Sequence, residues 1–160
     1  MIEEPADHGI VVPLLLRPFP TPVVACGFAE VTGPDGCHPS EVLTAARGLA
    51  DAVTALSSRC RVLLVASAHS SAALSARAPL TKRTEGTELH GLLVEALGEG
   101  SLDRLTQLPA DAWHAAGACG AGPLMTLAHL LPHAAVRGFH VCAPFGVGYL
   151  SAFFDLGTAS

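Results

Sequence analysis

The chain has 160 residues, of which half are hydrophobic and 14% are charged. A net charge of −5 without a basic cluster argues against a nucleic-acid partner. The length suits one domain, which we expect to span residues 1–160. No apolar run approaches the roughly 20 residues that span a bilayer, and five cysteines without CxxC spacing suggest reduced thiols, so a cytoplasmic location is expected. The high apolar content predicts that part of the surface meets another chain.

The first apolar run follows an Asp-His-Gly corner. His8 stands between Asp7 and Gly9, and residues 10–16 are apolar. A histidine at a glycine-hinged corner beside a buried element can serve acid/base chemistry, because the ordinary pKa of its ring lies near neutrality. The alternative interpretation is a histidine that only caps a turn or a helix.

Hydrophobic patterning along the rest of the chain predicts alternating strands and helices. Continuous apolar runs predict strands, and apolar residues three or four apart predict helices. The order favours an α/β fold with a mainly parallel central sheet flanked by helices. The expected elements are strands at 23–28, 61–66 and 136–142, helices at 39–56, 84–97, 101–105 and 110–116, and a helix from the glycine-rich turn at 119–123 to Leu131. Residues 144–149 form a loop into an apolar tail.

Two further positions could carry chemistry. His69 follows the 61–66 strand in a loop of small residues, at the strand end where α/β sheets bind ligands. Cys119 precedes a predicted helix, whose unpaired N–H groups and dipole favour a thiolate. The structural alternatives are a solvated loop histidine and a small residue in a tight turn. His90 lies on the 84–97 helix, and the pattern leaves open whether it faces the same cleft.

Four segments form an ordered set along nearly the whole chain: residues 7–14 (DHGIVVPL), 63–79, 118–124 (ACGAGPL) and 144–150 (PFGVGYL). The first resembles the DHG…VPL corner of the class III extradiol ring-cleavage dioxygenases, the LigB-like superfamily. The second is similar to the strand and loop of its S-x-D-L-S-H motif. The third resembles the C-G-x-x-P segment of the Memo-like branch, and the fourth the closing stretch of subunit-B-like members. The chain therefore resembles the C-terminal half of that fold.

The resemblance implies an enzyme that binds Fe(II) through two histidines and a carboxylate and opens catechols with O₂. His8 would transfer the proton and His69 would line the substrate pocket. Cys119 would lie near the metal, and His90 stands where the family has a helical Asp. Imidazoles in place of carboxylates favour Fe(II) or another transition metal over Mg or Ca. We thus predict catalytic roles for His8 and His69 and metal contacts for Cys119 and His90.

The chain departs from the family pattern at the metal centre. The family's two metal histidines lie in an N-terminal half without a counterpart here, His69 replaces its Asp, and Ala72 replaces its SH histidine. Two functions follow from the resemblance. One is a dioxygenase subunit that opens a catechol- or aminophenol-like ring, completed by a partner chain or by a homo-oligomer. The other is a catalytically degenerate, non-enzymatic partner subunit of the same fold. No nucleic acid or membrane is expected as a partner.

Overall fold

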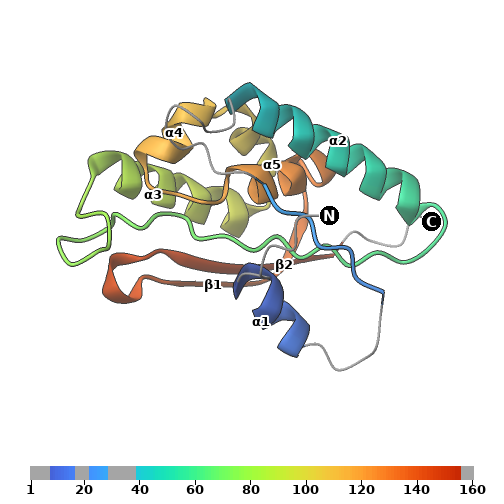
Figure 1. Cartoon of the computed structure of the whole chain (residues 1–160), viewed down its shortest axis with the longest axis horizontal. Coiled ribbons are helices and arrows are strands. Elements are labelled where there is room, and N and C mark those ends of the chain that lie inside the picture. Colours follow the sequence, from blue (N-terminus) through green and yellow to red (C-terminus); the bar gives the residue numbers. More distant parts are fainter. Residues whose placement is uncertain (1–7, 17–21, 29–38, 156–160) are drawn as a thin grey trace, which may run out of the picture.

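The computed structural model describes residues 8–16, 22–28 and 39–155. It is a mixed α/β fold in which α2 to α5 gather on one side of a two-stranded hairpin (Figure 1). The α/β class expected from the sequence is confirmed at this level. The described elements are α1 (His8–Leu16), α2 (Pro39–Ser57), α3 (Thr84–Glu99), the 3-10 helix η1 (Leu102–Gln107), α4 (Ala110–Ala115), α5 (Ala121–Leu130), β1 (Ala135–Cys142), the 3-10 helix η2 (Pro144–Gly146) and β2 (Tyr149–Asp155).

The helices predicted after residue 38 are confirmed, with small shifts at their ends. α3 starts at Thr84 as predicted and is capped by Gly100, whose φ of +73° is the left-handed conformation that favours glycine. The N–H of Gly100 donates to the carbonyl of Ala96. α5 ends at Leu130, two residues before Pro132, whose ring cannot continue a helix.

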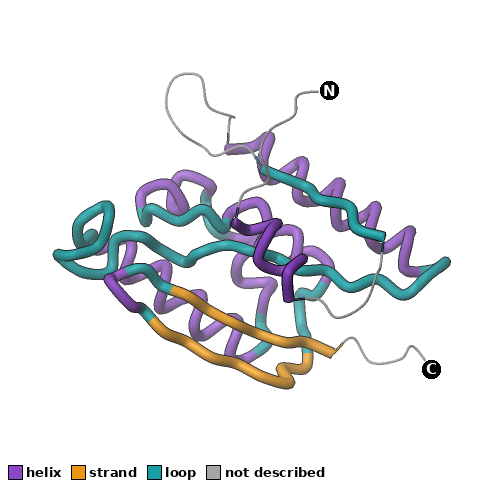
Figure 2. The backbone as a smooth tube through the Cα atoms, turned by 60° about the horizontal axis from the view of Figure 1, so that its bottom comes forward, coloured by secondary structure: helices purple, strands orange, loops and turns teal. Residues whose placement is uncertain are grey.

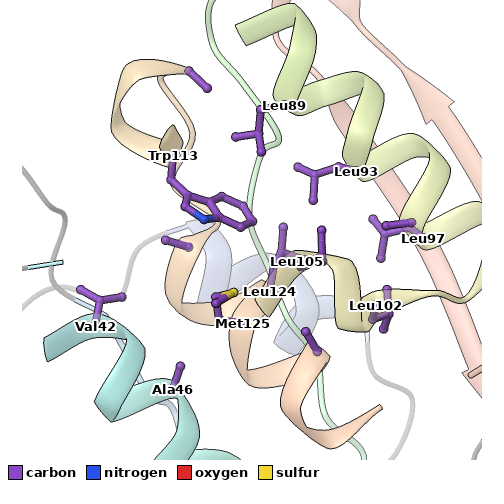
Figure 3. Packing of buried hydrophobic residues seen from close by; sticks show 14 residues of the cluster. Val42, Ala46, Leu89, Leu93, Leu97, Leu102, Leu105, Trp113, Leu124 and Met125 are labelled. Atoms are coloured by element: carbon purple, nitrogen blue, oxygen red, sulfur yellow. The ribbon is translucent and has the colours of Figure 1, made fainter. Parts of the chain in front are cut away.

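The main core lies between these helices. Leu89, Leu93 and Leu97 are spaced four residues apart on α3, so they share one face, and all three are buried. Trp113 of α4 points into the same cluster (Figure 3). α2 lies against α5 and contributes Val42 and Ala46. Each large side chain buried here stabilises the fold by about 1.5–3 kcal/mol relative to its exposed state. The helical layer (α2 to α5 and η1) therefore closes on its own residues.

The hairpin is antiparallel, so the described part of the chain shows no mainly parallel sheet. β1, predicted at 136–142, is confirmed at Ala135–Cys142, and it pairs with β2 from Cys142↔Tyr149 to Ala135↔Asp155. β2 was not predicted from the sequence, because its apolar residues were interpreted as a tail. Phe154 and its even-numbered neighbours on β2 pack against the helical layer.

The segments predicted as buried strands at 23–28 and 61–66 form no ladder within the described residues, so these two predictions were wrong. Residues 61–68, here called the extended segment, have an extended backbone and connect α2 to the loop that follows (Figures 1 and 2). Their side chains alternate between exposed and half-buried. A continuous apolar run favours extended backbone, but a strand also needs a neighbouring strand in register.

The apolar run after His8 is a helix, α1, and it is not buried as expected. Leu15 and Leu16 are each 78% exposed. Apolar residues follow one another without polar interruption in this helix, so no single face is suited to water. Within the described ranges, no helix combines the length and apolar character that a membrane span requires.

Candidate functional site

The candidate site forms where residues 69–74, here called the anchoring loop, meet the turn between α4 and α5. The backbone N–H of Ala72 donates to the carbonyl of Gly117 at 2.9 Å. The hydroxyl of Ser71 donates to the carbonyl of Ala116 at 2.7 Å. On its other side the loop bonds to η2, where Leu74 N–H donates to the carbonyl of Gly146 at 3.0 Å. Side-chain and backbone bonds together fix the loop on both sides.

This arrangement brings together His69 and Cys119, which lie 50 residues apart in the sequence. The Cys119 Sγ lies 2.9 Å from Nδ1 of His69, and Nε2 of the same ring lies 3.2 Å from the carbonyl oxygen of Gly117. A carbonyl can only accept, so Nε2 must carry the ring proton of neutral His69. Nδ1 is then an acceptor, and the thiol donates to it. Both residues are half-buried.

The surroundings of Cys119 stabilise negative charge on its sulfur. The backbone N–H of His69 donates to Sγ at 3.2 Å, which is a second hydrogen bond between the same two residues. Cys119 also directly precedes Gly120, the N-cap of α5, so it lies at the positive end of a ten-residue helix. A Cβ on Gly120 would lie 2.9 Å from Leu124 Cδ1 and 3.2 Å from Ala68 Cβ. Glycine thus lets the helix start approach the loop closely.

A second polar pair lies next to the first. Ser70 Oγ lies 2.6 Å from His90 Nδ1, and the same hydroxyl lies 2.9 Å from the carbonyl oxygen of Gly148. Burial lowers the pKa of His90 below its usual value, because the charged ring loses hydration. His90 is therefore favoured as the neutral ring. A Cβ on Gly148 would lie 2.7 Å from His90 Nδ1, so the pair leaves room only for glycine there.

The structure thus places the predicted site residues in two different side-chain pairs. Cys119 pairs with His69, whereas His90 pairs with Ser70. Among the described residues no three His, Cys, Asp or Glu side chains gather as a metal site. His8 begins α1, and its side chain lies outside the described ones, so its catalytic role stays a prediction. The metal contacts predicted for Cys119 and His90 also stay predictions.

Two residues of the site were missed from the sequence. Gly117 orients His69 through its carbonyl, and Ser70 holds His90 through its hydroxyl. The Ser-Ser pair directly after His69 is a signal that could have drawn attention to Ser70, since serines in a loop of small residues commonly bond to nearby groups. A backbone carbonyl carries no such signal, so Gly117 could not have been found this way.

Comparison of the chain with protein-family models and with curated protein sequences finds no match.

Proposed function

We propose that this chain is one subunit of a LigB-like assembly in which a second chain covers the apolar outer face of the hairpin and the extended segment. This face is here called the open side. The observation that carries the proposal is the exposure of large apolar side chains there. Phe153 of β2 is 62% exposed and Leu63 is 80% exposed. Contiguous apolar surface of this kind marks protein interfaces.

The alternation of side chains supports placing these residues on one face. On β2, Leu150 and Ala152 face the helical layer, so Phe153 faces away from it. Ala66 and Ala68 of the extended segment line one small cavity together with Leu150 and Ala152. Leu63 is an odd-numbered residue of the segment, whereas the inward-facing Ala66 and Ala68 are even-numbered. Its side chain therefore points outward, in agreement with its high exposure. The hairpin and the extended segment thus have a covered side and an open side.

The extended segment also offers a neighbour backbone groups that have no backbone partner within the described part of the chain. Among the described residues, backbone hydrogen bonds toward the hairpin begin at the anchoring loop, where Ser70 N–H donates to Gly148 O at 2.9 Å and Gly148 N–H donates to Ser71 O at 2.8 Å. In the proposed assembly, residues 23–28 and 61–66 gain strand neighbours from the second chain. The mainly parallel central sheet expected from the order of the predicted elements belongs to this assembled state.

The activity proposed for the assembly is non-haem, metal-dependent extradiol cleavage of a catechol- or aminophenol-like ring. This part rests on the four ordered motifs. The described residues do not by themselves fit an iron site, because no three ligating side chains gather among them. The metal ligands are therefore assigned to the second chain. When bound, Fe(II) would supply the redox chemistry with O₂. This chain would contribute His8 for proton transfer and His69 in the substrate pocket.

Co-purification with a chain that carries the family's two metal histidines tests this function. We expect a stoichiometric complex that contains iron and consumes O₂ with catechol. Leu63→Asp should weaken the complex by about 10²-fold, because a buried leucine contributes about 1.5–3 kcal/mol. Glu95→Ala, an exposed change on α3, is the matched control and should leave binding unchanged. If wild-type chains do not associate, the subunit proposal fails.

A non-enzymatic subunit of the same fold is the second candidate. The scattering of the predicted metal contacts over two separate pairs favours it. The same complex distinguishes the two candidates: association without bound iron, copper or zinc and without ring cleavage would support the structural subunit and exclude the dioxygenase.

A further inference from the structure

We propose that Cys119 and His69 form a nucleophile–base pair that accepts an acyl group from an activated ester or thioester. This inference is independent of the assembly and of any metal. The thiol donates to Nδ1 across 2.9 Å, so the base already accepts a hydrogen bond from the proton that the nucleophile must lose. Such a contact between a cysteine and an oriented histidine is the basic geometry of thiol-based covalent catalysis.

The orientation of His69 is set by a third group. Nε2–H donates to the carbonyl of Gly117 at 3.2 Å, which turns Nδ1 toward the thiol. Gly117 has a φ of +62°, a conformation that glycine adopts without strain. Its own N–H donates to His114 O at 2.9 Å, and the next residue, Ala118, donates to the carbonyl of Trp113 at 3.0 Å. Trp113 is buried in the core, so the orienting carbonyl is held by the rigid helical layer.

The choice of an acyl substrate follows from the groups beside the sulfur. The first N–H groups of α5, those of Ala121 and Gly122, have no carbonyl one turn earlier in the helix, and Ala121 lies two residues after Cys119. N–H groups at this position can stabilise the oxyanion that forms when a thiolate attacks a carbonyl carbon. The thiol, its base, the orienting carbonyl and the helix start come together from the anchoring loop and the α4–α5 turn.

The covalent step balances without an external redox partner. As Sγ attacks the acyl carbon, Nδ1 of His69 takes the thiol proton, a C–S bond forms, and the carbonyl electron pair moves to oxygen. The tetrahedral species collapses, the bond to the leaving alkoxide or thiolate breaks, and that group takes the proton from His69. Water then attacks the acyl-Cys119 thioester while His69 takes its proton. The C–S bond breaks, the acid is released, and the proton returns to the sulfur.

The test uses the purified full chain and p-nitrophenyl acetate, with the acetylated residue located by peptide mass spectrometry. The free, exposed cysteines Cys60 and Cys142 serve as internal references. We expect a burst of nitrophenol and acetyl transfer to Cys119 about 10²-fold faster than to Cys60 at pH 6, although Cys119 is less exposed. This ratio is measured in one wild-type sample. An equal or slower rate at Cys119 would overturn the proposal.

His69→Gln sharpens the result, because glutamine keeps polar contacts but cannot act as a base. We expect it to slow acetylation of Cys119 by about 10²-fold and to leave the rate at Cys60 unchanged. Circular dichroism confirms whether the variant folds. If the variant is folded and Cys119 reacts as fast as in the wild type, His69 is not the base and the pair is structural. If the variant does not fold, the wild-type ratio decides.

Discussion

The helical layer and the open side contain similar apolar side chains in opposite surroundings. Leu93 of α3 is 0% exposed, whereas Leu63 of the extended segment is 80% exposed. Leu93 packs in a core that the chain completes by itself (Figure 3). Leu63 lies outside the core cluster, on the open side, away from the helical layer. An apolar face of a sheet is stabilised when another layer packs on it, so the difference marks the open side as the place where the proposed second chain would pack.

The largest expected effect separates these two leucines directly. Leu93→Ala should reduce the free energy of unfolding by about 2–5 kcal/mol, because it leaves a cavity in a packed core. Leu63→Ala should change it by less than about 0.5 kcal/mol in the chain alone. Urea denaturation followed by circular dichroism measures both. Similar losses for the two variants would mean that Leu63 is buried in solution and that the open side does not exist.

The next largest effect on stability is expected from substitutions at two glycines of the helical layer. Gly100 caps α3 at φ +73°, and a Cβ there would collide with the carbonyl of Ala134. Gly100→Ala should therefore cost about 1–2 kcal/mol from the left-handed conformation, and more from the collision. A Cβ added at Gly91, inside the same helix, would meet nothing within 4 Å, so Gly91→Ala should stabilise by about 0.5–1 kcal/mol. Thermal melting of both variants shows whether each substitution raises or lowers the melting temperature. A change in the same direction for both would contradict the described end of α3.

The smallest effect concerns His90, which joins the helical layer to the anchoring loop. Burial lowers its pKa in the folded state, so the unfolded chain binds more protons between the lowered value and the usual 6.5. The stability that the chain gains while His90 is neutral is therefore complete above pH 6.5, and it is lost as the pH falls toward the lowered pKa. His90→Gln should flatten the pH dependence of the urea midpoint in that range. An unchanged slope would show that His90 is as hydrated in the folded chain as in the unfolded one.

The helices after residue 38 could be predicted from the sequence because their signals are local. Thr84 and Gly100 bound a periodic apolar face that is complete within one segment. The strands could not be predicted equally well, because a ladder depends on a neighbour elsewhere in the chain. Residues 61–66 have the clearest strand pattern, yet they stay unpaired among the described residues, whereas 149–155 pair with β1.

The residues of the candidate site could be predicted where their signals are local, but their contacts could not. His69 and Cys119 were each selected from local features, namely a loop after an apolar run and a position before a helix. Their contact depends on the anchoring loop bonding to the α4–α5 turn, 50 residues away, which no local pattern encodes. The expectation that His90 shares a site with Cys119 came from the resemblance, and the described structure instead pairs His90 with Ser70.

Hydrogen–deuterium exchange of the extended segment tests the central claim, that this chain has an open side completed by another chain. In the chain alone, shown to be monomeric by light scattering, the amides of residues 62–68 should exchange near the rate of an unstructured peptide. Those of Leu93 and its neighbours in α3 should exchange orders of magnitude more slowly. In the co-purified complex, residues 62–68 should become protected. Protection equal to that of α3 in the monomer, or no gain in the complex, would contradict the account.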